Sequence, residues 1–266
     1  MPNVLTKGRE QASIKHFRVT FFSRSRDRLT DAPNSLSIVI PTWCEAAEIG
    51  DAVDSARTLD DGRGVEVIVA DGASPDETAT IATAHGAHVV TALKGRGAQL
   101  AAGARAATGE FLLFLHADAR LPAHARVAID RELADADVAG GNFALRFVPE
   151  TPAARLFTRA NDIRRRRLGI YYGDSAIFVR KSVYVALGGF RDLPLFEDYD
   201  FVQRLQQAHR TAYIQDVEVR ASARRFERRP FSTLAVWSAL QVLYSCGVPP
   251  ISLARLYRDL GTAVGK

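Results

Sequence analysis

The sequence has few cysteines and no long apolar segment near its start. Cys44 and Cys246 lie too far apart to form a C-x-x-C metal or redox motif, and one pair does not make a disulfide framework. Residues 1–35 contain only short apolar pairs among basic side chains, so they lack the core of a signal peptide. We therefore expect a cytoplasmic protein in a reducing compartment.

Two common nucleotide-binding loops are also missing. A Rossmann dehydrogenase carries G-x-G-x-x-G directly after its first strand, and a P-loop enzyme carries G-x-x-x-x-G-K-S/T. Here the first apolar run is followed by Pro-Thr-Trp-Cys-Glu at residues 41–45, and Gly95-Arg96-Gly97 lacks the P-loop spacing. Both classes are therefore disfavoured.

The positive charge is unevenly placed. The formal net charge is +5, and residues 1–35 carry seven lysines and arginines against three acidic residues. Further basic clusters occur at residues 164–167 and 224–229. Such clusters suit phosphates, lipid headgroups or nucleic acid, although a solvated surface explains each of them more simply. For residues 1–35 we predict a disordered basic leader.

The order of apolar and Ala-rich segments predicts the fold class. With 266 residues, 47% of them hydrophobic, the chain can bury a full core. Short apolar runs alternate with segments of helical length, which predicts an α/β fold whose mostly parallel sheet is covered by helices on both faces. The expected strands are 36–40, 65–70, 87–91 and 110–115, and the expected helices are 46–59, 75–85 and 97–108.

The carboxyl ends of the four expected strands are polar or contain glycine. Ligands of open parallel sheets collect at this edge, so four such ends favour a nucleotide-phosphate site over ordinary loops. The four segments are residues 41–45, 71–74, 94–97 and 116–118.

Several side chains in these segments fit a nucleotide. Asp71 serves either as a turn carboxylate or as an acceptor for the imide N–H of uracil. Ser74-Pro75 predicts the N-cap and first position of a helix. Lys94 and Arg96 precede another helix and suit a diphosphate, although such loop cations are more often only exposed.

His116 and Asp118 are two residues apart at the end of the apolar run 110–115. On an extended strand end both side chains can point the same way. Two protein ligands suit a divalent ion shared with substrate phosphates, Mn²⁺ or Mg²⁺, and the histidine favours Mn²⁺. The simpler alternative is a chain that leaves the core through polar residues.

Two later segments carry further signals. Glu197 and Asp198 open a segment with helical spacing, and either the helix dipole or a general base explains the acidic pair. The 25 residues between Arg229 and Arg255 carry no charge. Polar residues interrupt this stretch and Pro249-Pro250 should stop its helix, so we predict a packed helix or oligomer contact, or else an interfacial helix, rather than a membrane span.

In their order along the chain, five segments resemble family 2 glycosyltransferases of the GT-A fold. They are SIVIPTWCEA, VIVADGASPDET, GRGAQLAAGARAATGEFLLFLHADARLP, GDSAIFVRKSVYVALGGF and FEDYDFVQRL, and the resemblance covers roughly residues 36–226. His-Ala-Asp before Arg-Leu-Pro, with SARRFER later, resembles a bacterial subgroup associated with radical SAM and selenium-related genes. The resemblance implies a Rossmann-like GT-A domain at residues 36–229 and a helical C-terminal segment at 230–266, packed or membrane-associated.

The resemblance also implies roles for individual residues. Asp71 would hold the uracil, Arg96 would approach the diphosphate and Asp118 would bind the metal. Asp198 would deprotonate the acceptor, with Glu197 beside it, in a single inverting displacement. The full set is Pro41, Thr42, Glu45, Asp71, Lys94, Arg96, Gln99, His116, Ala117 and Asp118 for the nucleotide sugar, His116 and Asp118 for the metal, Asp198 and Glu197 for catalysis, and Gly173, Asp174, Arg224 and Arg225 for the acceptor side.

Four positions depart from the family pattern. His116 stands where the commoner metal motif has aspartate, and Cys44 stands where asparagine is usual. Ser175 replaces a glutamine that often follows Gly-Asp, and Phe226 replaces a tryptophan. The acceptor side therefore matches less closely than the donor side.

The implied function is transfer of a sugar from a UDP-linked donor to an unidentified, lipid-like acceptor at the inner face of the membrane. No nucleic acid is expected as a partner, and a homo-oligomer is left open. A sugar nucleotidyltransferase, the first rival, carries its glycine-arginine loop after the first strand and not the third. A non-catalytic basic module that binds membrane or nucleic acid, the second rival, explains the charge but not the four strand ends.

Overall fold

Four parallel strands form the first half of the central sheet. The computed structural model describes residues 35–227 and 229–264, with side chains up to residue 258, so the predicted leader lies outside the described residues except for Ser35. The β-branched and apolar runs form the strands that the sequence predicts, and they pair in the order β3-β2-β1-β4. Their bounds are β1 Leu36–Thr42, β2 Val65–Asp71, β3 His88–Thr91 and β4 Phe111–Phe114.

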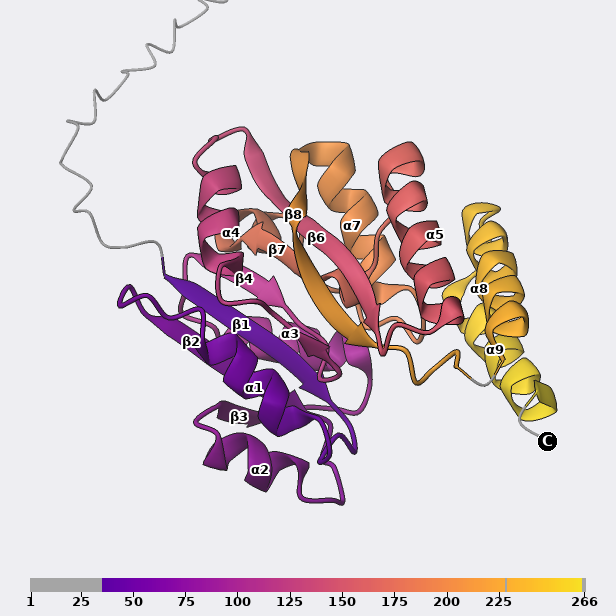
Figure 1. Ribbon diagram of the computed structural model, residues 1–266, viewed down its shortest axis with the longest axis horizontal. Helices are drawn as coiled ribbons and strands as arrows, with labels where there is room; N and C mark the ends of the chain where they lie inside the picture. Colours follow the sequence, from indigo (N-terminus) through magenta and orange to yellow (C-terminus); the bar gives the residue numbers. More distant parts are fainter. Residues whose placement is uncertain (1–34, 228, 265–266) are drawn as a thin grey trace, which may run out of the picture. The chain divides into compact units, whose positions relative to one another are not determined.

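The second half of the sheet is mixed in direction (Figure 1). β7 pairs antiparallel with β4 and with β6, β6 pairs in parallel with β8, and β5 pairs antiparallel with β8. Within the described residues this gives one eight-stranded sheet, which is mostly parallel as predicted. The bounds are β5 Ala119–Arg120, β6 Val138–Val148, β7 Ile177–Arg180 and β8 Arg210–Ser222.

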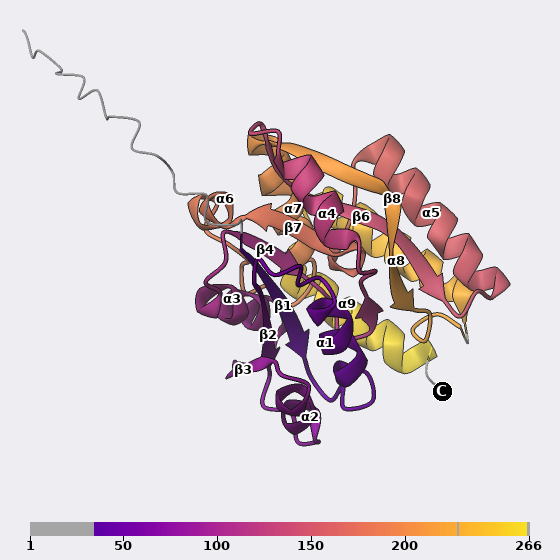
Figure 2. The ribbon, with the colours of Figure 1, turned by 60° about the vertical axis from the view of Figure 1, so that its left-hand side comes forward.

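Helices cover both faces of the sheet, as Figure 2 shows for α1 and α3 on opposite sides of β1. The alternation of a strand decides which residue faces which layer, so Ile38 and Ile40 pack with one group of helices while Val39 packs with the other. The first group is α1 Ile49–Arg57, α2 Thr78–Ala84, α4 Ala125–Leu133 and α5 Pro152–Leu168, and the second is α3 Arg96–Ala106, α6 Lys181–Ala186 and α7 Glu197–Ala208.

The uncharged C-terminal stretch forms helix α8, Pro230–Ser245, which ends before the two prolines. Pro250 then opens α9, Pro250–Val264, because proline is well tolerated in a first helical turn. Leu234 and Trp237 of α8 pack against the core. Among the described residues, no helix is both long enough and apolar enough to cross a membrane.

One predicted helix start is wrong. Ser74 and Pro75 do not begin α2, which starts at Thr78 with Glu77 at its N-cap. The Ser74 hydroxyl instead hydrogen-bonds to Asp71, and Ser74 accepts the backbone N–H of Cys44. A serine that satisfies a neighbouring carboxylate is thus not available to cap the helix.

Candidate functional site

Hydrogen bonds around Asp71 join the carboxyl ends of β1 and β2. The Asp71 Oδ1 atom accepts the hydroxyls of Thr42, at 3.1 Å, and Ser74, at 2.6 Å, while Oδ2 accepts the Ser74 backbone N–H at 2.8 Å. Asp71 is buried, yet Oδ2 keeps a lone pair beyond that one bond. Asp71 therefore fills the turn role and still has capacity to accept a ligand N–H.

Gln99 and Pro41 support these strand ends from within. The buried Gln99 Nε2 atom donates to the backbone carbonyls of Thr42 and of Ala70, the latter at 3.2 Å. Pro41 is buried in β1 and lies in register with Ala70 of β2. Gln99 thus ties the ends of β1 and β2 together, and Pro41 forms part of the buried end of β1.

Trp43 is a residue that the sequence reasoning missed. Its side chain follows β1 and is 37% exposed, and the Lys94 Nζ atom lies 3.5 Å from its ring centroid. An exposed tryptophan directly after a buried strand, in Pro-Thr-Trp-Cys-Glu, was the available signal. The pair offers a flat aromatic face and a cation close to Asp71.

Two arginines stand against the carboxylates of the first and fourth strand ends. The Arg224 Nη2 atom lies 2.7 Å from Glu45 Oε2 and 3.4 Å from Asp118 Oδ2, and Arg225 Nη2 lies 3.8 Å from the same Asp118 oxygen. The acidic neighbours raise the pKa of Arg224 against the opposing effect of burial. Positive charge is therefore already placed beside Asp118.

A small cavity of about 40 Å³ brings the predicted metal and acceptor residues together. His116, Asp118, Asp174 and Arg225 line it, and three aromatic rings together with Ala221 and Ser222 form the remaining wall. Burial, followed by Arg96 and Arg225, lowers the pKa of His116 well below its usual value, so the imidazole is neutral and keeps a lone pair. Within the part of the chain that the structure describes, no three His, Cys, Asp or Glu side chains are grouped to hold a metal.

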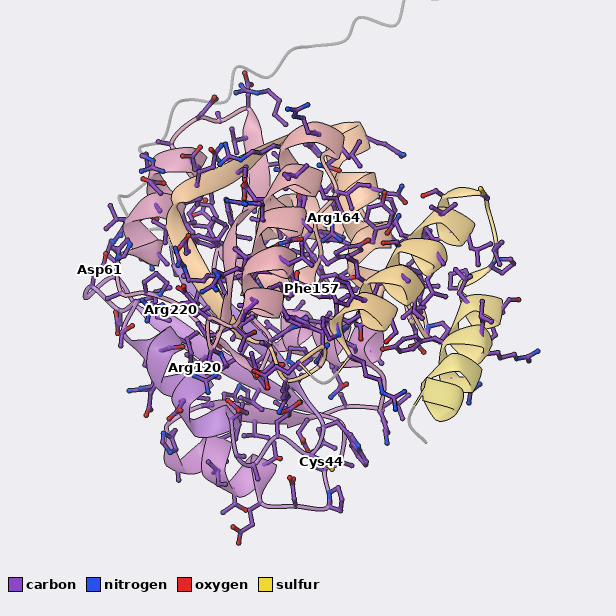
Figure 3. All side chains as sticks on the ribbon, turned by 45° about the vertical axis from the view of Figure 1, so that its right-hand side comes forward. Cys44, Asp61, Arg120, Phe157, Arg164 and Arg220 are labelled. Atoms are coloured by element: carbon purple, nitrogen blue, oxygen red, sulfur yellow. The ribbon has the colours of Figure 1, made fainter. Side chains whose placement is uncertain are left out.

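Asp174 is an unusual carboxyl in this cavity. Its Oδ1 atom is buried and finds no hydrogen-bond partner among the described residues. Burial raises the pKa of Asp174 to about 6, with Arg164 opposing and Asp198 adding to the rise. Arg164 lies on α5 with Phe157 (Figure 3), and its guanidinium stacks 4.4 Å from the ring centroid of Tyr172.

The N-terminus of α7 presents the acidic pair to Arg96. The Arg96 Nε atom donates to Glu197 Oε1, and Arg96 Nη2 lies 3.9 Å from Asp198 Oδ2. Asp198 is buried and accepts the backbone N–H of Gly173 at 2.8 Å and that of Tyr199 at 2.7 Å. Burial raises the pKa of Glu197, with Arg96 opposing and Asp198 adding to the rise. The prediction that a helix begins at this pair is confirmed.

Gly173 allows His116 and Asp198 to approach one another. A Cβ atom at Gly173 would lie 2.7 Å from His116 Nε2 and 3.3 Å from Asp198 Oδ2. Only glycine fits this contact without a shift of the imidazole. Gly173 therefore lets His116 lie close to the acidic pair.

Helix α8 packs directly on this part of the site. Phe196 precedes the acidic pair with a positive φ of 64°, and its ring lies 4.8 Å from that of Tyr244. The Tyr172 hydroxyl donates to Gln241. Strained backbone at functional sites persists where the surroundings hold it, and α8 supplies part of that support.

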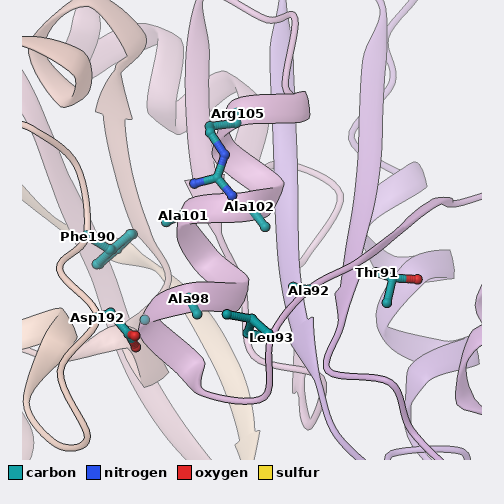
Figure 4. A pocket seen from close by; sticks show the side chains of 10 residues that line it. Thr91, Ala92, Leu93, Ala98, Ala101, Ala102, Arg105, Phe190 and Asp192 are labelled. Atoms are coloured by element: carbon teal, nitrogen blue, oxygen red, sulfur yellow. The ribbon is translucent and has the colours of Figure 1, made fainter.

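A larger cavity of about 520 Å³ lies elsewhere, on the outer side of α3 (Figure 4). Alanines of α3 form its floor, with Leu93, Phe190, Arg105 and Asp192 around it. None of the predicted donor, metal, catalytic or acceptor residues lines it. Size alone therefore does not identify the site.

The comparisons with known proteins agree with this geometry. The family model described as glycosyl transferase family 2 matches residues 37–185, more than half of the sequence, so the chain belongs to glycosyl transferase family 2. It is accordingly a glycosyltransferase, which disfavours the sugar nucleotidyltransferase alternative. The narrower radical SAM-associated subgroup stays a prediction. No curated protein matches the sequence.

Solved structures share the fold at low sequence identity. A Pyrobaculum calidifontis mannosyltransferase, PcManGT, in complex with GDP-Man and Mn²⁺, matches with a TM-score of 0.60 at 20% identity, over 78% of this chain and 61% of that one. Glucosyl-3-phosphoglycerate synthase from Mycobacterium tuberculosis, with Mn²⁺, UDP-Glc and phosphoglyceric acid, matches with a TM-score of 0.58 at 21% identity, over 82% of each chain. S. aureus TarS 1-349 with UDP-GlcNAc matches with a TM-score of 0.59 at 16% identity, over 71% of this chain and 58% of that one.

These likenesses confirm the GT-A fold, and helices α8 and α9 confirm the predicted helical C-terminal segment. The chain spans only about three fifths of the mannosyltransferase and of TarS. The domain boundary after residue 229 stays a prediction.

Proposed function

We propose that this glycosyltransferase moves a sugar from a UDP-linked donor to an acceptor with inversion at the anomeric carbon. The observation that carries the proposal is the convergence of Asp71, Asp118 and the acidic pair Glu197-Asp198 at one edge of the sheet. The solved structures of similar fold support it, because they hold nucleotide sugars linked to UDP or GDP.

The nucleobase of the donor would bind between Asp71 and Trp43. The free lone pair of Asp71 Oδ2 accepts a ring N–H, which uracil and guanine have and cytosine lacks. Trp43 provides an aromatic face for stacking, from which Lys94 would move toward the phosphates. A UDP-linked donor is our primary proposal, and a GDP-linked donor is the alternative to test against it.

His116 and Asp118 would hold a divalent ion, Mn²⁺ or Mg²⁺, together with phosphate oxygens. The residues fit such an ion, because a neutral imidazole and a carboxylate line one cavity and Asp118 already faces positive charge from two arginines. When bound, the ion would supply charge neutralisation for the departing diphosphate. Arg224 and Arg225 would share that task once Asp118 no longer binds them.

Asp198 would act as the general base. Two backbone N–H groups fix its carboxylate, and each oxygen retains a lone pair that can take the acceptor's proton. Arg96 holds Glu197 beside it and provides positive charge between the acidic pair and the diphosphate region. The acceptor hydroxyl would then attack the anomeric carbon as the bond to the diphosphate breaks.

The acceptor would approach between Asp174 and the rings of Phe147, Phe226 and Trp237. This wall suits an acceptor with an apolar part, in line with the lipid-like acceptor expected from the sequence. Location in the cytoplasm, at the inner membrane face, and a homo-oligomer remain expectations that can be measured separately.

A thermal-shift experiment tests the donor proposal. Wild type and Asp118→Ala are heated with UDP, GDP or CDP, each with and without Mn²⁺, and Asp192→Ala in the outer cavity is the matched control. We expect stabilisation of wild type and control that needs Mn²⁺ and is largest for UDP; a ligand at 100 times its Kd adds about 2.7 kcal/mol. If GDP alone stabilised the protein, the proposed donor would be GDP-linked instead of UDP-linked. If no nucleotide stabilised it, the donor site would be refuted.

A further inference from the structure

Exposed apolar side chains gather on three helices, α5, α8 and α9. Of the twelve large hydrophobic residues that are exposed in the described part of the chain, eight lie there. The other four, Trp43, Leu93, Val127 and Val185, lie on separate elements. We call the exposed residues of the three helices the C-terminal helical face, whose large apolar members are Leu156, Ile163, Leu168, Phe231, Val242, Ile251, Leu256 and Tyr257.

The outward side of α8 is uncharged along its length. Phe231, Ala235, Ser238 and Val242 are exposed and follow one another at helical spacing. A helix on a water-facing surface normally turns charged side chains outward. An uncharged outer stripe over about three turns indicates that something covers it.

Charge on the same helices is strongly positive. The segments of α5, α8 and α9 contain eight arginines and two aspartates, a net charge of +6, whereas the rest of residues 36–266 sums to −5. Arg155, Arg159, Arg167, Arg255 and Arg258 are exposed. The occupant of this face is therefore anionic as well as able to receive apolar side chains.

The C-terminal helical face borders the acceptor side of the site. Figures 1 and 2 both show α8 between α5 and α9, and the Phe157 ring of α5 lies 5.8 Å from Trp237 of α8. On the opposite side of α8, Gln241 accepts a hydrogen bond from the Tyr172 hydroxyl, and Tyr244 packs on Phe196. Whatever covers the outer side of α8 lies one helix away from the acidic pair.

We infer that the C-terminal helical face docks on a membrane surface that contains anionic lipids. Interfacial helices combine apolar side chains that enter the acyl boundary with arginines that reach the headgroups. A second copy of this chain fits poorly, because two sets of these helices, each with a net charge of +6, would repel one another. The inference goes beyond the proposed function and does not depend on transfer activity.

Vesicle binding by the full chain tests the inference without any donor. Co-sedimentation is measured with phosphatidylcholine vesicles and with vesicles that also contain phosphatidylglycerol. We expect binding only when the anionic lipid is present. The affinity for these vesicles should fall about fivefold for each arginine removed in Arg159→Gln/Arg167→Gln. It should also fall in Phe231→Ser/Val242→Ser, because these side chains would enter the apolar layer. The matched controls Arg105→Gln/Arg210→Gln and Leu93→Ser/Val185→Ser should bind as wild type, because these exposed residues lie on other elements.

The two cysteines give a second, independent readout. Both are exposed, Cys246 at the end of α8 and Cys44 after β1. A polarity-sensitive thiol dye on Cys246, in Cys44→Ser, should shift to the blue on anionic vesicles, and the same dye on Cys44, in Cys246→Ser, should not. The inference would be overturned by an equal loss of vesicle binding in face and control variants, or by an unshifted dye at Cys246. It would also be overturned if the wild type did not bind vesicles, a result that would favour an acidic protein as the partner.

Discussion

On the proposed donor side of the site, polar groups at strand ends bind one another, whereas on the proposed acceptor side aromatic rings pack around a buried carboxyl. Thr42 and Ser74 both donate hydrogen bonds to Asp71, and Arg224 joins Glu45 to Asp118. On the other side Phe157 stacks on Phe226, with ring centroids 3.9 Å apart, and Asp174 keeps a buried oxygen without a partner among the described residues.

The difference teaches what each side requires of a ligand. A donor would replace contacts that already exist, because cations of the chain stand at the carboxylates and Lys94 covers Trp43. An acceptor would instead supply a contact that is missing at Asp174. Donor binding is thus an exchange of partners, and acceptor binding relieves an unsatisfied group.

The largest expected effect is on turnover, at the boundary between the two sides. Asp198→Ala should lower the rate of transfer, or of donor hydrolysis, by about 10²- to 10⁴-fold because it removes the base. UDP affinity should stay near wild type, since Asp198 binds backbone N–H groups of the protein. Steady-state rates and calorimetric UDP titration check this, with Asp192→Ala as control. Wild-type turnover in Asp198→Ala would show that Asp198 takes no part in the mechanism.

Loss of packing among the rings on the proposed acceptor side should lower the stability of the protein strongly. Phe226 is buried against Phe157 and Trp237, so Phe226→Ala should lower the free energy of unfolding by about 3–5 kcal/mol. Phe231→Ala, on a side chain that is 77% exposed, should change it by less than about 0.5 kcal/mol. Urea unfolding measures both variants, and equal effects would show that the ring cluster does not support this side.

Asp174 should make stability depend on pH. The folded state holds its proton up to about pH 6, whereas the unfolded state releases it near 3.8, so the free energy of unfolding falls as pH rises through this window. The loss should reach up to roughly 3 kcal/mol, and Asp174→Asn should abolish it. Urea unfolding on both sides of the window, with Asp192→Asn as control, checks this; an unchanged pH slope in Asp174→Asn would contradict the raised pKa.

The smallest expected effect concerns the exchange of partners on the donor side. Glu45→Gln releases Arg224 for the diphosphate, so UDP affinity with Mn²⁺ should rise about two- to fivefold, the size expected for a partly exposed ion pair. Arg224→Gln should lower the affinity. Calorimetry measures both, and weaker binding by Glu45→Gln would mean that Glu45 contacts the nucleotide itself.

The positions of the proposed donor-side residues in the fold could be predicted from the sequence better than those of the proposed acceptor side, for a physical reason. The first strands, and the acidic pair at the start of α7, are read from short local patterns. Asp71 and Asp118 follow their strands directly, so the parallel sheet alone brings them to one edge.

The remaining features depend on contacts between distant segments. Arg224 reaches Glu45 across 179 positions, and no local pattern predicts that pair. The Ser74 hydroxyl, which the sequence assigns to a helix cap, accepts the backbone N–H of Cys44, and these two residues are 30 positions apart. Likewise, α8 packs on Tyr172 and Phe196, and composition shows only that the stretch is uncharged.

A crystal structure of the protein with UDP and Mn²⁺ tests the central claim most directly. We predict that Asp118 coordinates the ion, that Asp71 accepts the N–H of the uracil ring, and that Arg224 and Arg225 leave Asp118 for the diphosphate. UDP bound in the cavity outside α3, or bound with Asp118 still paired to the two arginines and no ion at its carboxylate, would contradict the account.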